Sequence, residues 1–515
     1  MVFRRRARQY AARAPREGRG EVKVGRGRVR SARSPDVVIV GSGCSGVAAG
    51  VKLKRAGIET FTIYEKSLEI GGTWRDNTYP GCEVDTPSTM YSFSFTIPGW
   101  SRTHARQADL RKYLESVVDE FGLRSHIRTG VGVERAVWDE AAQTYRIELD
   151  DGTTTSCHVL VSAVGFLNVP RLPDWPGLDR FQGPVFHTAR WEHEHDLAGK
   201  RVAIVGTGSS AAQILPEVAA TAERVLLFQR EPGWVMPKGE RDFSAEERQA
   251  LLTRRRWRLA RLRALYQIEK RLWHGGTYRP GSKVHDRSEQ ICRDYIAKVF
   301  ADRPDLKEAV TPSYPFWGKR LIYATTYYPA LKRDNVALIP RAVTRVTETG
   351  VVDAEGVEHA ADVLVLATGF QPTNYLARLQ VVGRNGKELH DYWNGEPTAF
   401  LGITVPGFPN FYLMYGPGTN GGEIIWMLER QAEYVVRALR RMMRTGTTAI
   451  EVKRRWTTVY NRWLQWSVRD TAWTVSNNYF KASNGKIVTQ WPYSPLGYLA
   501  LAKSLGRWSE TTRKG

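Results

Sequence analysis

The sequence predicts an α/β fold with two successive βαβ domains, the second inserted in the first and carrying a helical insert. Two glycine-rich turns, beginning at Gly41 and Gly206, each follow an apolar run and precede small apolar residues at helical spacing. A third apolar run ends in Ala367-Thr368-Gly369 without glycines that would start a helix, so it opens no third unit. The length of 515 residues also exceeds the size at which a single hydrophobic core stops growing.

A basic segment precedes the first βαβ unit. Residues 1–35 hold eleven Arg and one Lys against two Glu, which is +10 of the chain's net +22. This segment has no apolar periodicity, so we expect a disordered tail. Its charge would attract nucleic acid or an anionic membrane without implying specificity.

The first unit has the spacing of a dinucleotide-binding turn. The buried-strand pattern Val37–Val40 leads into Gly41-x-Gly43-x-x-Gly46. The first glycine makes the turn, the second lets a pyrophosphate approach the backbone, and the third allows the helix to pack on the strand. The next predicted strand ends at Glu65, where a ribose hydroxyl needs an acceptor.

The second unit repeats this pattern with a different charge at its end. Its turn is Gly206-x-Gly208-x-x-Ala211, and the strand that follows ends in Arg230. A cation at this place suits a 2′-phosphate and favours NADPH over NADH. The adjoining Glu231 leaves the alternative open, because a carboxylate could accept from a free ribose hydroxyl.

Two dinucleotide sites of opposite charge preference imply FAD together with NADPH, and hydride transfer to the flavin follows from that pair. The third apolar run, before Ala367, has the pattern of a buried parallel strand. We expect it to return the chain to the sheet of the first domain.

Residues 240–310 are rich in helix formers and form the predicted helical insert. They contain a basic stretch, RRRWRLARLRALYQIEKRLW, with leucines near one helical face. These leucines are Leu252, Leu259, Leu262, Leu265 and Leu272. We expect the stripe to pack in the core or in a lid, with binding to a membrane surface as the alternative.

Two further motifs lie outside the glycine-rich turns. One is F-x-G-x-x-x-H-x-x-x-W from Phe181 to Trp191, and the other is G-x-W-x-x-x-x-Y-P-G-x-x-x-D from Gly72 to Asp85. On these motifs the chain resembles the type I Baeyer–Villiger monooxygenases, which are class B flavoprotein monooxygenases. The resemblance covers about residues 36–500. It departs from the family pattern at Glu192, where the family usually has Pro or Asp.

The resemblance implies roles for several residues. Arg320, in Phe316-Trp-Gly-Lys319-Arg320, would contact the flavin and stabilise the peroxyflavin, and Asp85 would pair with it. Lys319 would bind the NADP phosphate. His187 and Trp191 would belong to a linker that reorganises as NADP moves. A guanidinium stays protonated at neutral pH, so Arg320 suits the stabilisation of an anion.

The resemblance also implies the reaction. NADPH reduces FAD, dioxygen adds to form a C4a-peroxyflavin, and this oxidises a small ketone to an ester or lactone. The nearest alternative is an N- or S-hydroxylating flavin monooxygenase, which shares the glycine motifs but lacks the motif that ends at Asp85. A flavin disulfide reductase is disfavoured because no CxxC pair is present. A non-catalytic flavoprotein tethered to RNA or membrane is the distant alternative.

The patterns and the resemblance together divide the chain and nominate its site. The segments are 1–35, the tail; 36–180, the first part of the FAD-binding domain; 181–196, a linker with the family fingerprint; 197–345, the NADPH-binding domain; and 346–515, the second part of the FAD-binding domain with the C-terminal region. The candidate cofactor-binding residues are Gly41, Gly43, Ser45, Gly46, Glu65, Lys66, Gly72, Thr73, Trp74, Tyr79, Asp85, Gly206, Gly208, Ser209, Ser210, Arg230, Lys319, Thr368 and Gly369; the catalytic candidates are Arg320 and Asp85.

Composition bounds the remaining predictions. The four cysteines are far apart, which disfavours disulfides and a structural zinc site and fits the cytoplasm. His193 and His195 have no further Cys or His near them in sequence, so no metal site is expected. We expect no specific nucleic-acid partner and no integral membrane association. The oligomeric state and the individual ketone stay open.

Overall fold

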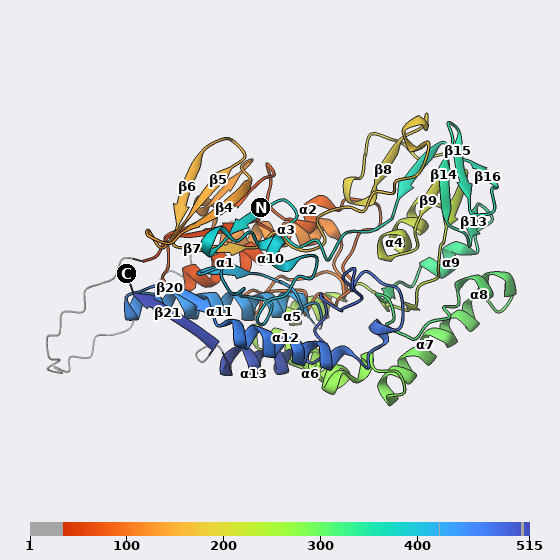
Figure 1. Cartoon of the computed structure of the whole chain (residues 1–515). Helices are drawn as coiled ribbons and strands as arrows, with labels where there is room; N and C mark the ends of the chain where they lie inside the picture. The colour runs from red at the N-terminus through yellow and green to blue at the C-terminus, as the bar shows by residue number, and fades with distance from the viewer. Residues whose placement is uncertain (1–33, 422, 506–508, 515) are drawn as a thin grey trace, which may run out of the picture. The chain divides into compact units, whose positions relative to one another are not determined.

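The computed structural model describes residues 34–421, 423–505 and 509–514 (Figure 1). The predicted basic tail therefore lies, except for residues 34 and 35, outside the described residues. Within the described ranges, every helix is too short or too polar to cross a membrane.

The first βαβ unit opens a five-stranded parallel sheet with the strand order β19-β7-β1-β2-β3. All four residues of β1 are buried, as expected for a strand covered on both faces. The strands of this sheet are β1 (Val37–Val40), β2 (Phe61–Glu65), β3 (Ile127–Thr129), β7 (Val159–Ser162) and β19 (Phe411–Leu413). Helix α1 (Cys44–Arg55) covers the sheet and packs against α11 (Ile424–Thr445). We call this part of the chain the first lobe.

A second five-stranded parallel sheet has the order β13-β10-β9-β17-β8. Its strands are β8 (Val185–His187), β9 (Arg201–Val205), β10 (Arg224–Phe228), β13 (Val336–Ile339) and β17 (Val363–Leu366). Helix α4 (Ser209–Val218) follows β9, as the glycine-rich turn predicts. We call this part the second lobe. The chain then returns to the first sheet through β19, so the predicted insertion of one domain in the other is confirmed.

One prediction about this topology is wrong. The run before Ala367 forms β17, which pairs with β9 and β8 of the second sheet and does not return to the first. A buried parallel strand has the same apolar pattern in either sheet, and the pattern alone does not select its neighbour. The segment boundary at 345 consequently falls inside the second lobe. The linker 181–196 contributes β8 to the same sheet.

The two connections between the lobes run side by side. Arg171 N donates to Gly369 O at 2.8 Å, and Gln371 N donates to Val169 O at 3.0 Å. An isolated antiparallel bridge joins Pro170 to Phe370 between these bonds. The chain therefore leaves the first lobe and re-enters it at one place.

The remaining strands of the described residues form four smaller sheets. Their members are β4 (Val133–Asp139), β5 (Thr144–Leu149), β6 (Thr154–Cys157) and β18 (Gln380–Val382); β14 (Val343–Val346), β15 (Gly350–Asp353) and β16 (Glu358–Ala360); β11 (Val235–Met236) and β12 (Ile322–Tyr323); and β20 (Thr447–Val452) and β21 (Glu510–Lys514).

The remaining helices cover the two lobes and form the insert. The α-helices are α2 (Thr73–Asp76), α3 (Gln107–Glu120), α5 (Ala245–Leu251), α6 (Arg254–Leu272), α7 (Lys283–Val299), α8 (Pro304–Val310), α9 (Tyr327–Leu331), α10 (Leu389–Trp393), α12 (Arg454–Val468) and α13 (Pro495–Ser504). The 3₁₀ helices are Arg124–His126, Leu178–Arg180, Thr188–Arg190, Trp273–Tyr278, Arg384–Gly386 and Ala472–Thr474. Helices α5 to α8 occupy the predicted insert at 240–310.

The leucine stripe of the insert does not pack as expected. Leu272 is buried, but Leu252, Leu259 and Leu262 are 51%, 45% and 63% exposed. Helical spacing predicted the helix correctly, and yet it does not determine which face the rest of the fold covers. The prediction of a core or lid stripe is therefore wrong for these three residues.

Candidate active site

A cavity of about 1190 Å³ is lined by residues of both lobes. It lies at the carboxyl ends of the parallel strands, where open α/β sheets place their ligands. Of the predicted cofactor-binding and catalytic residues, all but Gly46 and Gly206 line it. The cavity thus brings together predicted residues as far apart in the chain as Gly41 and Gly369.

The first glycine-rich turn fits a pyrophosphate. A Cβ added at Gly46 would lie 1.9 Å from the carbonyl oxygen of Gly41, so only glycine lets α1 approach the turn this closely. Gly43 caps α1 without a side-chain hydrogen bond, and the first turn of the helix holds no acid. Its backbone N–H groups are therefore available to an anion.

Glu65 occupies the predicted place at the end of β2 and is buried. Its Oε2 accepts hydrogen bonds from Ser42 N at 2.9 Å and Ser42 Oγ at 2.8 Å, and its Oε1 accepts from Ser67 N at 3.0 Å. These bonds fix the carboxylate beside the turn, and Oε1 keeps a second acceptor site for a ribose hydroxyl. Burial and the cation of Arg378 lower the pKa of the adjacent Lys66.

The second glycine-rich turn has a similar frame. Gly206 has φ +113°, and a Cβ there would lie 2.4 Å from the carbonyl oxygen of Ala367, so Thr368 and Gly369 lie directly beside the turn. Gly208 caps α4 without a side-chain hydrogen bond, and no atom lies within 4 Å of a Cβ placed on it. The N-terminus of α4 is therefore a second place where a pyrophosphate fits.

The charged residues at the end of β10 differ in their partners. Glu231 forms an ion pair with Lys319 Nζ. Arg230 is exposed, lines the cavity, and has no ion-pair partner among the described residues. Glu231, which left the choice between NADPH and NADH open, is thus paired with Lys319, while Arg230 remains available to a phosphate.

Arg320 and Asp85 meet inside the cavity although 235 positions separate them in sequence. Arg320 Nη2 donates to Asp85 Oδ2 at 2.9 Å. Partial desolvation would lower the pKa of Arg320, whose side chain remains 42% exposed, but Tyr479 and the carboxylate of Asp85 outweigh it, and the pKa rises. The guanidinium is therefore a permanent positive charge with a fixed orientation.

The segment with Gly72 to Asp85 connects the lobes. In α2, Trp74 Nε1 donates to the hydroxyl of Tyr91 at 3.0 Å, and both residues line the cavity. Further along, the hydroxyl of Tyr79 donates to Gln213 Oε1 on α4 of the second lobe at 3.0 Å. This motif thus holds one glycine-rich turn near the other, a function that its spacing alone did not reveal.

His187 and Trp191 do not line the cavity. His187 ends β8 and is buried, with Nδ1 accepting from Ala189 N at 3.0 Å. Burial, helped by the nearby charge of Arg190, lowers the pKa of His187 to about 4, so the ring is neutral at physiological pH. Trp191 packs edge-on against Phe186 with ring centroids 5.0 Å apart. A role in proton transfer is therefore disfavoured for His187.

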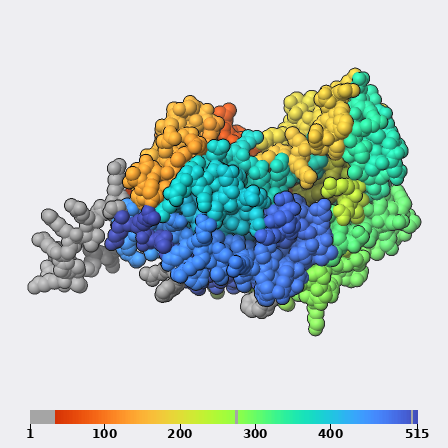
Figure 2. All heavy atoms as spheres, viewed as in Figure 1, coloured from red at the N-terminus to blue at the C-terminus, as the bar shows by residue number. Residues whose placement is uncertain are grey.

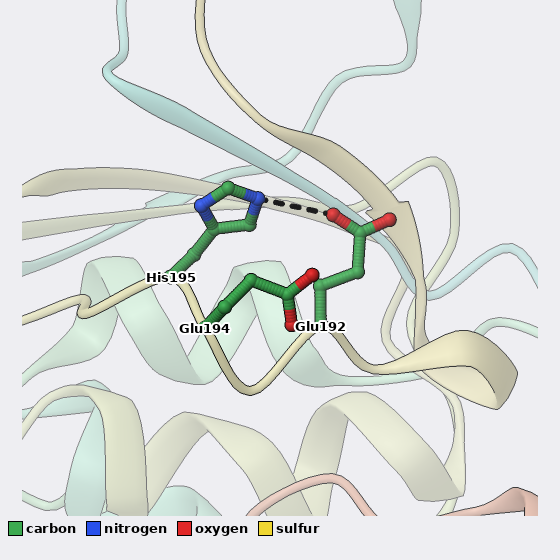
Figure 3. A group of neighbouring side chains, drawn as sticks. All are labelled: Glu192, Glu194 and His195. Carbon is green, nitrogen blue, oxygen red and sulfur yellow. Dashed lines mark hydrogen bonds and ion pairs between the residues drawn. The ribbon is translucent and has the colours of Figure 1, made fainter.

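Three side chains after the fingerprint tryptophan form a small cluster (Figure 3). One potential ligand atom from each of Glu192, Glu194 and His195 lies within 4.8 Å of the others. His195 Nε2 already pairs with Glu192 Oε2 at 3.1 Å, while His193 bonds instead to Thr78 Oγ1. The expectation of no metal site stays a prediction.

Several cavity residues escaped the sequence analysis. They include Tyr91, Phe166, Gln213, Phe370, Arg378, Tyr415, Asn420, Asn478 and Tyr479. One signal could have found two of them, because the tetrapeptide pattern A-x-G-F occurs at 163–166 and again at 367–370, once after β7 and once after β17. The same repeat would have placed β17 beside the second glycine-rich turn. The tyrosines carry no such signal.

Comparison with known proteins agrees with this geometry. Residues 38–252 match the family model described as pyridine nucleotide-disulphide oxidoreductase, and all four cysteines of the chain are free. A Baeyer–Villiger monooxygenase of Streptomyces coelicolor is 39% identical over 465 residues, which is 88% of each chain.

Solved structures show the same fold. Cyclohexanone monooxygenase from Rhodococcus sp. Phi1, bound to NADP⁺, matches with a TM-score of 0.84 and 27% identity over 93% of this chain and 99% of that one. OTEMO in complex with FAD and NADP matches with a TM-score of 0.83 and 26% identity over 93% of this chain and all of the other. With two glycine-rich turns and an Arg–Asp pair in one cavity, and with relatives aligned over nearly the full length, the chain belongs to the Baeyer–Villiger monooxygenase family.

Proposed function

We propose that this cavity binds FAD against the first lobe and NADPH against the second, and that it oxidises a small ketone with dioxygen to an ester or lactone. The observation that carries the proposal is the Arg320–Asp85 pair, which lies in the same cavity as both glycine-rich turns. A pyridine nucleotide reductase needs the two turns but has no use for a fixed cation between them.

The two dinucleotides would be held by different residues. The N-terminus of α1 and Glu65 would bind the pyrophosphate and ribose of FAD, and the N-terminus of α4 and Arg230 would bind NADPH. When bound, reduced flavin supplies electrons that activate dioxygen. The protein supplies the position of both groups and the charge around them.

Arg320 would stabilise negative charge during oxygen transfer. Addition of an oxygen nucleophile to a ketone places negative charge on the former carbonyl oxygen, and a guanidinium held in a fixed orientation stabilises such charge with little reorganisation. Asp85 fixes the guanidinium through the 2.9 Å bond, and Tyr479 lines the same cavity. Since the pKa of Arg320 is raised, it cannot give up its proton to the oxygen that it stabilises.

The test separates oxygen transfer from NADPH consumption. Purified FAD-loaded enzyme is given NADPH, a panel of cyclic and linear ketones, and ¹⁸O₂; labelled ester or lactone, NADPH loss and hydrogen peroxide are measured together. We expect Arg320→Ala to lower ester formation by about 10²–10³-fold while NADPH oxidation continues with release of hydrogen peroxide. Arg469→Ala, which removes a surface cation paired with Asp470, is the matched control and should behave as the parent.

Two results would count against the proposal. Undiminished ester formation by Arg320→Ala would remove Arg320 from the reaction. Label incorporation into amines or sulfides, with no ketone in the panel oxidised by the parent enzyme, would favour the N- or S-hydroxylating alternative.

A further inference from the structure

Helix α6 carries an apolar stripe on its outer face. Leu259, Leu262 and Tyr266 are 45%, 63% and 64% exposed, and Leu252, just before the helix, is 51% exposed. At 3.6 residues per turn the three helical members fall within about 60° of the circumference. Single exposed leucines are ordinary on a protein surface, but an aligned row of this kind marks an interaction surface.

Exposed cations lie beside this stripe and, at Arg255, on its line one turn before Leu259. They are Arg254, Arg255, Arg256, Arg258, Arg263 and Lys270. None of them has an ion-pair partner among the described residues, whereas Arg293 on the neighbouring α7 is paired with Glu289 at 2.7 Å. The only acid of α6 is Glu269, which is buried. The outer face therefore has three apolar side chains in a row, with exposed cations around them and no exposed acid.

Buried contacts on other parts of the helix fix it, so the stripe cannot turn inward. Trp257 is buried with 2% of its surface exposed. Arg261 Nη1 donates to the carbonyl oxygens of Thr89 and Ser92, each at 2.7 Å. Glu269 Oε1 accepts from the backbone N–H of Leu496, the second residue of α13, at 2.9 Å. Figure 1 shows α6 beside α13 at the lower edge of the view, and Figure 2 shows light-green atoms at the same edge of the surface.

Charge decides among the partners that could cover this surface. The basic segment 1–35 and a second copy of α6 would both bring positive charge against positive charge. A nucleic acid would satisfy the cations and leave the stripe exposed, because leucines do not contact phosphates favourably. An anionic bilayer satisfies both features: its headgroups pair with the cations, and its acyl boundary accepts the apolar side chains.

We propose that α6 docks the protein on an anionic lipid surface, with Leu259, Leu262 and Tyr266 inserted at the acyl boundary and the flanking cations among the headgroups. The helix lies along the surface rather than across it, in keeping with the finding that no described helix could span a membrane. This inference is independent of the reaction, since none of the three residues lines the cavity.

The experiment is a vesicle sedimentation assay with the full chain. Vesicles of phosphatidylcholine with about one-third phosphatidylglycerol are compared with vesicles of phosphatidylcholine alone. The test variant is Leu259→Ser/Leu262→Ser/Tyr266→Ser. The matched control is Val459→Ser/Val475→Ser, which removes two apolar side chains of 58% and 65% exposure from elsewhere on the surface. All three proteins keep the same tail, so the tail's own attraction to anions is constant.

We expect the parent and the control to sediment with anionic vesicles, and the test variant to bind about tenfold more weakly or worse with unchanged NADPH oxidation. Equal binding by the test variant would overturn the proposal and assign vesicle binding to the tail. The proposal would also be overturned if the parent and the test variant bound RNA equally well and neither bound vesicles. If the mass of the parent and of the control increases with protein concentration, and that of the test variant does not, a second copy covers the stripe instead.

Discussion

At the end of β10 two adjacent residues of opposite charge have different surroundings, and the difference bears on the choice of coenzyme. Glu231 is engaged by Lys319, which leaves it less able to accept from a free 2′-hydroxyl. Arg230 has no acidic partner among the described residues and lines the cavity. A 2′-phosphate would complete this arrangement, because a guanidinium binds phosphate oxygens in a bidentate manner.

We expect Arg230→Ala to raise the KM for NADPH by about 10–100-fold, since a charge-assisted contact contributes about 1.5–3 kcal/mol. The KM for NADH should change little, because NADH has no phosphate at this position. Steady-state kinetics with NADPH and with NADH measure the two KM values in the parent and in the variant. Parallel changes for the two coenzymes would show that Arg230 does not read the 2′-phosphate.

Between the lobes, a short segment of the first lobe contacts three parts of the second. Asp85 holds Arg320, and two positions earlier Glu83 Oε1 accepts from Lys238 Nζ at 2.6 Å. The Lys238 side chain is 1% exposed, so the pair is nearly withdrawn from water. Gln213 Nε2 on α4 donates to the backbone carbonyl of Glu83 at 3.0 Å. The segment therefore sets where α4 lies relative to Arg320.

Removing one member of the buried pair leaves the other without its counter-charge. We expect Lys238→Met to destabilise the protein by about 3 kcal/mol or more and to slow flavin reduction by NADPH, because α4 loses its register. The double variant Glu83→Gln/Lys238→Met should recover most of the stability, since it removes both charges. Denaturant unfolding and rapid-mixing reduction give the two readouts. A double variant as unstable as the single one would assign the loss to packing rather than to the unpaired carboxylate.

Across the whole molecule, one buried acid makes stability depend on pH. Glu423 precedes α11, is 8% exposed, and has a side-chain oxygen without a hydrogen-bond partner among the described atoms. Burial raises its pKa from 4.5 to about 8, although Arg271 and Arg261 oppose the shift. The folded protein keeps this proton while the unfolded chain releases it above pH 4.5. Its contribution to stability is therefore lost progressively from about pH 4.5 to about pH 8.

A Glu423→Gln variant lacks this titration. We expect its melting temperature to exceed that of the parent by an amount that grows between pH 5 and pH 8 and then stays constant, with an upper bound of about 1.4 kcal/mol per pH unit. Melting curves at unit pH intervals measure it. If the melting temperatures of the parent and the variant depend on pH in the same way, Glu423 is ionised in the folded state.

The sequence predicted two dinucleotide-binding units because the glycine-rich turns occur twice, and each turn requires a strand before it and a helix after it. The prediction that one unit is inserted in the other depended on the run before Ala367, whereas in the structure β19 makes the return to the first sheet. The sequence also predicted nearly all residues at the glycine-rich turns, and the resemblance to the Baeyer–Villiger monooxygenases predicted the Arg320–Asp85 pair. It did not assign β17 to its sheet, because strand partners depend on contacts that an apolar run does not encode. Tyr415 and Tyr479 were missed because isolated tyrosines, among 22 in the chain, have no informative spacing.

The paired connections at 169–171 and 369–371 make the segment between them a separate structural unit. Because the chain enters and leaves the second lobe through hydrogen-bonded neighbours, the ends of the intervening segment lie together, which is the geometry that tolerates domain insertion. The segment from 171 to 369 could be exchanged between relatives as one piece, with the two junctions joined in register by the Pro170–Phe370 bridge. Such a chimaera would need matched partners for the lobe contacts of Gln213, Lys238 and Arg261. Coenzyme preference and Arg320 would travel with the exchanged segment, while the first glycine-rich turn and Glu65 stayed behind.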